Sequence, residues 1–201
     1  MARRTAAQAA QTRHELVDAA VDVFSECGYA GATLERIADR AGVTRGALYH
    51  HFHDKADVYE TVLRRQADQV AGPLMDALTD DGPPLQRIRD FLVAYCTALE
   101  RDARFRRAVD LLLFGAAGAP QSAQERTRRG YETWLRAFEA VFGEAGERGE
   151  LRRAITPDAA ARTLLALTVG ATTAALRAPH LFSSAEHAES LANTLIAGLT
   201  P

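Results

Sequence analysis

Apolar residues recur every three or four positions along almost the whole chain of 201 residues, and this helical period constrains the fold more than any other feature. No stretch shows the sustained alternation of β-branched residues that is typical of a strand. The seven prolines lie at or near breaks in the helical pattern. We therefore expect an all-α protein of about nine helices, without strands.

Capping residues place the ends of several predicted helices. The predicted N-caps are Thr33, Thr44, Asp54, Asp102, Thr156 and Ser183, and the predicted stops are Gly28, Gly42 and the segment 115–118. Pro157 takes the first helical position after Thr156, and Glu186 completes a capping box with Ser183. The residues up to position 63 therefore predict a medium helix, two short helices and the start of a long one.

The composition excludes several classes of protein. Hydrophobic residues make up 47% of the chain and charged residues 25%, which argues against disorder. No apolar run approaches the roughly 20 residues of a membrane span, and the first residues lack the apolar core of a signal peptide. Two cysteines, Cys27 and Cys96, form no disulfide framework and no zinc spacing. We expect a cytoplasmic protein without a membrane association, in which both cysteines are small buried hydrophobes rather than a redox switch.

Residues 33–55 carry the clearest local pattern, TLERIADRAGVTRGALYHHFHDK. Two short helices joined at Gly42 predict a helix-turn-helix, because a sharp turn favours a glycine in the left-handed conformation. The apolar residues predicted to form its core are Leu34, Ile37, Ala38, Val43, Leu48 and Phe52. The net charge of the chain is −2, so an interpretation as a nucleic-acid binder must rest on this segment, where residues 36–55 carry a local net charge of +2.

The outer face of the second short helix suits DNA. It presents Thr44, Arg45, Gly46, Ala47, Tyr49, His50 and His53. Small residues allow the backbone to approach base edges, an arginine can donate two hydrogen bonds to guanine, and a tyrosine can bind a phosphate.

Residues 12–63 resemble the N-terminal domain of TetR-family transcriptional regulators. The matching residues are G-Y-x-x-x-T at 28–33, I-A-x-x-A-G-V-x-x-G-x-L-Y-x-H-F at 37–52, and the lysine at 55. The resemblance implies a DNA-binding domain with its connecting helix over 1–72, with the motif at 33–52. It also implies a ligand-binding and dimerisation domain over 73–201. The opening residues and the pattern after residue 84 are similar to the AcrR-like subgroup, whose members often control multidrug efflux genes.

The same resemblance implies a role for each matching residue. Thr33 and Thr44 are expected to contact phosphate. The residues expected along the groove are Arg45, Gly46, Tyr49 and His50, with His51 and Lys55 on the flanking backbone of double-stranded DNA. Arg3 and Arg4, in an N-terminal arm, are expected to reach the minor groove.

The remainder of the chain predicts a ligand site and a dimer. Aromatic residues gather at Phe91, Tyr95, Phe105, Phe114, Tyr131, Trp134, Phe138 and Phe142. Ordinary core packing explains any one of them, but as a group they predict an apolar site for a small inducer. Residues 157–176 and 184–199 form long apolar helical faces, which predict a homodimer through a four-helix interface and hence a palindromic operator.

Three other interpretations are weaker. His50, His51, His53 and Asp54 point in different directions on one turn, and no distant ligand set completes a metal site. The arginine runs 104–107 and 126–129 are expected to be solvated helix faces rather than a second nucleic-acid site. No catalytic, cofactor-binding or phosphate-binding motif supports an all-α enzyme. The sequence and its family resemblance therefore predict a repressor that a small apolar or aromatic ligand releases from DNA, and the AcrR-like resemblance implies an efflux or detoxification gene as its target. The alternative is a regulator of a metabolic or secondary-metabolite gene with a specific inducer.

Overall fold

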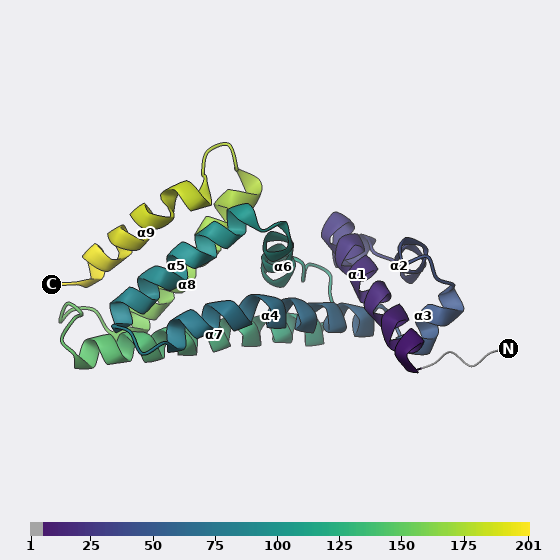
Figure 1. Cartoon of the computed structure of the whole chain (residues 1–201), viewed down its shortest axis with the longest axis horizontal. Coiled ribbons are helices and arrows are strands. Elements are labelled where there is room, and N and C mark those ends of the chain that lie inside the picture. The colour runs from purple at the N-terminus through teal and green to yellow at the C-terminus, as the bar shows by residue number, and fades with distance from the viewer. Residues whose placement is uncertain (1–5) are drawn as a thin grey trace. The chain divides into compact units, whose positions relative to one another are not determined.

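The computed structural model describes residues 6–201, except for the side chain of Pro73, and this part of the chain is entirely helical apart from turns and loops (Figure 1). The helices are α1 (Ala6–Gly31), α2 (Leu34–Arg40), α3 (Arg45–His51), α4 (Lys55–Thr79), α5 (Pro84–Arg101), α6 (Ala103–Phe114), α7 (Gln121–Glu147), α8 (Pro157–Arg177) and α9 (Ser184–Leu199). The predicted all-α class is confirmed.

The six predicted N-caps are confirmed at the level of single hydrogen bonds, whereas the stop predicted at Gly28 is a kink at a φ of 66° inside α1, which ends at Gly31. The hydroxyl of Thr33 accepts the N–H of Arg36, and the hydroxyl of Thr44 accepts the N–H of Ala47, each at 3.2 Å. The side chains of Asp54, Asp102, Thr156 and Ser183 accept N–H groups of the following helix in the same way. Gly42 turns the chain between α2 and α3 at a φ of 67°. These residues start and stop the helices because they satisfy backbone groups that the helices leave unpaired.

The chain divides into two compact units, and each is described by itself. The head unit comprises the residues up to Ala67 together with Leu111–Thr127, and the C-terminal unit comprises Asp68–Asp110 and Arg128–Pro201. The boundary predicted at residue 72 separates a DNA-binding from a ligand-binding function, and it stays a prediction.

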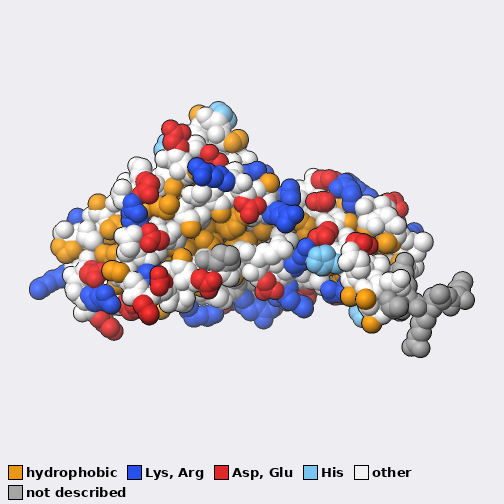
Figure 2. Space-filling model, viewed as in Figure 1, with side chains coloured by type: hydrophobic (Ala, Val, Ile, Leu, Met, Phe, Trp, Pro, Cys, Tyr) orange, Lys and Arg blue, Asp and Glu red, His pale blue; other side chains and the backbone are white. Residues whose placement is uncertain are grey.

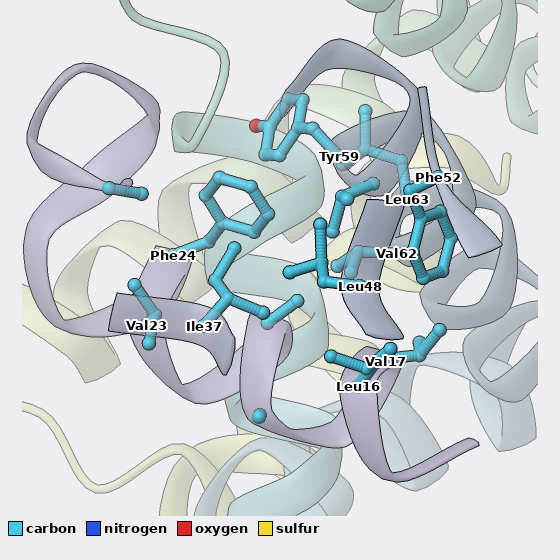
Figure 3. Packing of buried hydrophobic residues seen from close by; sticks show 14 of the residues in the cluster. Leu16, Val17, Val23, Phe24, Ile37, Leu48, Phe52, Tyr59, Val62 and Leu63 are labelled. Carbon is cyan, nitrogen blue, oxygen red and sulfur yellow. The ribbon is translucent and has the colours of Figure 1, made fainter. Parts of the chain in front are cut away.

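One apolar core holds the head unit together (Figure 3). Phe24 of α1 packs edge-on against Tyr59 of α4, with ring centroids 4.8 Å apart. Of the predicted helix-turn-helix core, Ile37, Ala38, Leu48 and Phe52 are buried, whereas Leu34 and Val43 pack against it half-exposed. α2 and α3 are only seven residues long, so their orientation depends on this core rather than on helix propensity.

In the C-terminal unit, α5 packs against α8 and α9. A carboxylate of α5 holds the start of α9: Glu100 accepts the N–H of Ala185 and the hydroxyl of Ser183, each at 2.8 Å. These two hydrogen bonds hold the pKa of Glu100 below its ordinary value. Glu100 thus stabilises the packing of α9 in its ionised form.

This contact predicts a pH dependence. A group whose pKa is lower in the folded than in the unfolded protein stabilises the fold at pH values above its unfolded pKa. This contribution disappears as the pH falls through the pKa of the folded state. The stability difference between the wild type and Glu100→Gln should therefore be largest near neutral pH and should shrink upon acidification below pH 4.5, the ordinary pKa. Urea denaturation at several pH values measures it. A difference that is constant with pH would show that the charge of Glu100 does not matter.

Within the described part of the chain, one helix, α8, meets the criterion for a membrane span, although the sequence analysis expected none. By length and composition it is apolar enough to cross a membrane, with a mean hydropathy of 1.4 over its most apolar window. The prediction considered uninterrupted apolar runs, whereas the alanines, leucines and valine of α8 raise its mean hydropathy although threonines interrupt them. Core helices of soluble proteins meet the same criterion. α8 buries one face, including Ala161, Leu164 and Ala171, within the C-terminal unit, but only 33% of the window is buried.

Candidate DNA-binding surface

The outer face of α3 is exposed, as a DNA-binding surface requires. Arg45, Gly46, Tyr49 and His50 are all exposed, and His51 is half-buried. Tyr49 keeps 50% of its surface accessible, and among the described residues only Leu181 is a more exposed large hydrophobic. The exposed half of this aromatic side chain is available to a partner.

The two predicted phosphate-binding threonines, Thr33 and Thr44, are both exposed N-caps. Because each hydroxyl accepts a helix N–H, its own O–H points to another acceptor. For Thr33 that acceptor is the carboxylate of Glu35, whose pKa the hydrogen bond helps to lower.

Arg45, the predicted base-reading residue, forms an ion pair through Nη2 with Glu35 of α2. Its side chain remains 60% exposed in this ion pair. The sequence analysis did not include Glu35, because nothing in the local spacing indicates that the first turns of α2 and α3 meet.

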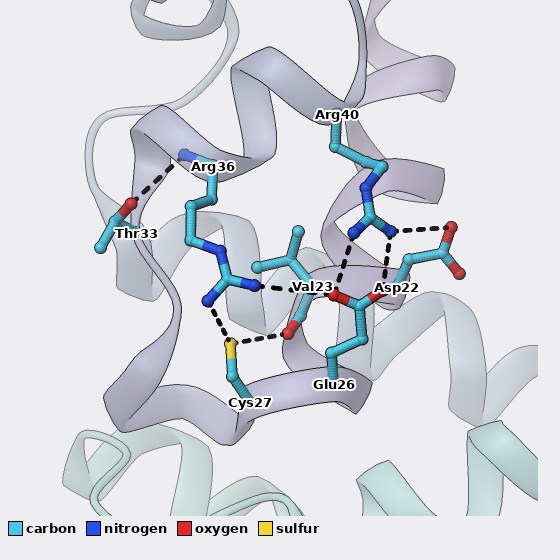
Figure 4. A network of polar contacts seen from close by, with 7 residues as sticks. All are labelled: Asp22, Val23, Glu26, Cys27, Thr33, Arg36 and Arg40. Carbon is cyan, nitrogen blue, oxygen red and sulfur yellow. Dashed lines mark hydrogen bonds and ion pairs between the residues drawn. The ribbon is translucent and has the colours of Figure 1, made fainter.

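The two arginines of α2, Arg36 and Arg40, form ion pairs with acidic residues of α1, although both remain exposed (Figure 4). Arg40 forms ion pairs with Glu26 at 2.9 Å and Asp22 at 3.9 Å, and Arg36 lies 3.6 Å from Glu26. The predicted local charge of +2 is therefore partly neutralised by acidic residues of α1. Positive and negative side chains are also intermixed over the face shown in Figure 2.

The cysteines differ from each other. Cys27 is half-buried; its thiol donates to the carbonyl of Val23 at 3.0 Å and accepts from Arg36 at 3.4 Å (Figure 4). The prediction of a small buried hydrophobe is wrong for Cys27, because a polar side chain from α2 reaches it. Cys96 is buried as predicted, and burial raises the pKa of its thiol to about 11.

Lys55 has a role that the sequence did not predict. Its ammonium donates to the carbonyls of Tyr29 at 2.8 Å and Ala32 at 3.0 Å, and it lies 4.3 Å from the centroid of the Tyr29 ring. Lys55 thus fixes the connection between α1 and α2. A phosphate contact, which the resemblance implied, would have to use the remaining N–H of the ammonium.

We expect Lys55→Met to lower the free energy of unfolding by about 1–3 kcal/mol, because it leaves two carbonyls without their charged donor. Arg64→Met is the matched control, since Arg64 is an exposed cation of the same helix. Urea denaturation followed by circular dichroism measures the loss. Wild-type stability of Lys55→Met, combined with a weaker salt dependence of DNA binding, would show that Lys55 acts on DNA instead.

The structure also places the histidines at 50, 51 and 53 and the two arginine runs. The rings of His50 and His51 meet edge-on at 5.5 Å, and His53 is an exposed turn residue. Within residues 6–201, no group of three or more His, Cys, Asp or Glu side chains could hold a metal ion. Four of the six arginines in the two runs are exposed as predicted, namely Arg104, Arg107, Arg128 and Arg129, whereas the prediction is wrong for Arg126, which is half-buried with its Nε covered. Arg106 is half-buried because it donates to the carbonyls of Leu99 and Glu100 at the end of α5.

The C-terminal unit brings five of the predicted ligand-binding aromatics together. Ring centroids in this cluster lie 5.0 to 6.0 Å apart, and its members are Phe91, Tyr95, Phe105, Trp134 and Phe138. Tyr131 is half-buried, and it lies close enough to contribute to the raised pKa of Tyr95. Phe114 belongs to the head unit instead.

One buried polar contact lies beside the aromatic cluster. The hydroxyls of Tyr95 and Thr172 are 2.6 Å apart. Thr172 donates to the carbonyl of Thr168 at 2.8 Å, so Tyr95 is the donor to Thr172. Burial raises the pKa of Tyr95, which keeps this donor protonated. The sequence analysis missed Thr172, because its pairing with Tyr95 spans 77 positions.

Two family models together match most of the chain. Residues 16–62 match the model described as "Bacterial regulatory proteins, tetR family". Residues 84–201 match "BetI-type transcriptional repressor, C-terminal". The chain belongs to the TetR family. The resemblance drawn from the helix-turn-helix is therefore confirmed, and the chain is a DNA-binding transcriptional regulator rather than an enzyme.

Full-length relatives of this TetR-family chain agree with the assignment. The transcriptional repressor BepR of Brucella suis is 31% identical over 98% of this chain and 96% of its own length. NalD, the secondary repressor of the MexAB-OprM multidrug efflux pump in Pseudomonas aeruginosa, is 32% identical; its structure aligns over 95% of this chain and 97% of its own with a TM-score of 0.81. A complex of SmeT, the repressor of the Stenotrophomonas maltophilia multidrug efflux pump SmeDEF, with triclosan is 29% identical. It aligns over 95% of this chain and 92% of its own with a TM-score of 0.83.

The N-terminal arm of this TetR-family regulator is not part of the surface described. Arg3 and Arg4, predicted to reach the minor groove, lie outside the described residues.

Proposed function

We propose that this regulator is a cytoplasmic repressor that binds a palindromic operator as a homodimer and leaves it when a small apolar ligand binds the C-terminal unit. The observation that carries the proposal is the aromatic cluster of Phe91, Tyr95, Phe105, Trp134 and Phe138 in a chain whose head unit carries the family's helix-turn-helix. An apolar site with few polar groups suits ligands of varied shape.

In the head unit, the proposed DNA contacts are those of the sequence analysis. Arg45 reads a base, Gly46 allows close approach, and Tyr49 and His50 lie along the groove. Thr33, Thr44, His51 and Lys55 contact the flanking phosphates. The exposed outer face of α3 supports this assignment.

The proposed dimer forms through residues 157–176 and 184–199. Its support is the apolar character of α8, of which only 33% is buried within one chain. Alanines along this helix allow a second helix to approach closely. Two copies of α3 are needed because one recognition helix covers too few base pairs for a specific operator.

The proposed ligand class is supported by the relatives that the chain resembles. NalD represses a multidrug efflux pump, and SmeT forms a complex with triclosan. We therefore propose an efflux or detoxification gene as the target and an apolar, aromatic molecule as the inducer. A ligand can release DNA only if it prefers a conformation that does not fit the operator. The proposed lever is α4, which continues from the head unit into the C-terminal unit.

The second candidate is a regulator of a metabolic or secondary-metabolite gene with one specific inducer. The observation in its favour is the buried hydroxyl pair of Tyr95 and Thr172. A buried hydrogen-bonding group discriminates strongly between a ligand that pairs with it and one that does not. Under this alternative, a polar metabolite releases DNA and varied apolar compounds do not.

Triclosan is the first ligand to test, and Trp134 is the probe because it is the only tryptophan. We expect triclosan to change the emission of Trp134 and to release a duplex that the protein has selected from a random library. Trp134→Ala should raise the triclosan concentration needed for release about tenfold, which corresponds to roughly 1.4 kcal/mol of binding energy. Its affinity for DNA should stay nearly unchanged.

Leu181→Ala is the control for a substitution elsewhere in the C-terminal unit, since Leu181 is 76% exposed. Apolar compounds that release DNA from Trp134→Ala as readily as from the wild type, without changing wild-type emission, would place the ligand site elsewhere. Release by a polar metabolite alone would favour the second candidate.

A further inference from the structure

The ion pair between Glu35 and Arg45 joins α2 to the proposed base-reading side chain of α3. Arg36 and Arg40, on the same short helix, form ion pairs with α1 instead. Glu35 is therefore the acidic residue of α2 that connects the helix to the DNA-facing surface.

Glu35 is itself held in place. It lies in the first turn of α2, where its own backbone N–H and the hydroxyl of Thr33 donate to its carboxylate. These two hydrogen bonds, and then the nearby charge of Arg45, hold the pKa of Glu35 below its ordinary value. The lowered pKa favours the ionised carboxylate, which is the form that pairs with Arg45.

The ion pair leaves Arg45 able to bind a base. It is made through Nη2, and the side chain remains 60% exposed. An unrestrained arginine loses much rotamer freedom when it binds, and this loss weakens binding. A guanidinium that is already held above the groove loses less freedom, provided that its held position is the one that DNA requires.

We propose that Glu35 is a positioning residue for DNA recognition: its carboxylate holds Arg45 in the conformation that reads a base, and so it increases the preference for the operator over other DNA. The inference rests on the proposed role of Arg45. It assigns no base contact to Glu35, which acts through Arg45.

The experiment compares Glu35→Ala, Arg45→Ala and the double variant by fluorescence anisotropy. The probes are a duplex selected from a random library by the wild-type protein, a scrambled duplex, and selected duplexes with single base changes. We expect Glu35→Ala to lower affinity for the selected duplex about two- to tenfold, the effect of freeing one long side chain. The loss should be concentrated at the base pair where Arg45→Ala relaxes preference. Glu35→Ala should have no further effect on the preference in the Arg45→Ala background.

Asp39→Ala is the matched control. Asp39 is an exposed carboxylate of the same helix, so its loss changes the net charge of α2 by the same amount without removing the partner of Arg45. We expect Asp39→Ala to change affinity for all duplexes alike. Glu35→Gln keeps the shape and an acceptor oxygen, and it should give a smaller loss than Glu35→Ala. It replaces Glu35→Ala as the test if circular dichroism shows that the alanine variant is unfolded.

Three results would overturn the inference. If Arg45→Ala weakens all duplexes equally, Arg45 does not read a base, and both its proposed role and the inference are wrong. If Arg45→Ala shows a position-specific loss but Glu35→Ala does not, the inference alone is wrong. If Glu35→Ala changes the base preference as much in the Arg45→Ala background as in the wild type, the inference is also wrong.

Discussion

Leu48→Ala is expected to lower the free energy of unfolding by about 2–5 kcal/mol and to abolish operator binding, because it leaves a cavity beneath the recognition helix. Leu48 is 1% exposed and is the buried residue of α3. It points into the core of the head unit (Figure 3). A seven-residue helix does not persist in water on its own, so α3 loses its orientation when this contact is removed.

The neighbouring Tyr49 provides the matched control, because it lies on the exposed side of α3. Tyr49→Ala should change stability by less than about 0.5 kcal/mol and should still weaken binding to the selected duplex. Urea denaturation and fluorescence anisotropy measure the two properties separately. Equal stability losses for the two variants would contradict the assignment of one face to the core and the other to DNA.

Gly115→Ala is the second substitution with a large expected effect. A Cβ at this position would lie 2.5 Å from the carbonyl oxygen of Leu111 and 2.9 Å from the hydroxyl of Tyr59. Tyr59 is completely buried, and its hydroxyl has no hydrogen-bond partner among the described residues. Neither neighbour can move freely, so we expect a destabilisation of about 1–3 kcal/mol or more.

Gly130→Ala is the control for Gly115→Ala. Gly130 lies inside α7, and a Cβ there would meet nothing within 4 Å. Alanine should therefore stabilise α7 by about 0.5–1 kcal/mol, because glycine is a poor helix former. Thermal denaturation of both variants gives the comparison. If Gly115→Ala proves as stable as the wild type, the close packing of Tyr59 against Gly115 is not a constraint on the head unit.

Features that depend on short stretches of sequence could be predicted. The N-caps at Thr33 and Thr44 depend on residues three positions away, and the turn at Gly42 depends on one backbone conformation. The helix-turn-helix core follows from the spacing of apolar residues on two short helices. The aromatic cluster of the C-terminal unit could be predicted as a group, because its members recur at helical spacing on three helices.

Features that depend on residues far apart in the sequence could not be predicted. The ammonium of Lys55 binds the carbonyl of Tyr29, 26 positions away. The partner of Tyr95 is Thr172, and the partner of Arg45 is Glu35 across the turn. Cys27 was expected to be buried because its position on α1 is apolar in pattern, but the approach of Arg36 is a property of the folded head unit. Long polar side chains select such partners only after the helices have packed.

The most direct test of the account is the binding of the full chain to a duplex selected from a random library. Fluorescence anisotropy and sedimentation measure affinity and stoichiometry together, with a scrambled duplex and a duplex altered in one half-site as controls. We expect a two-fold symmetric selected sequence, an even number of chains per duplex, and an affinity at least about 10³ times higher than for scrambled DNA. Equal binding to selected and scrambled duplexes, or saturation by a single chain, would contradict the account.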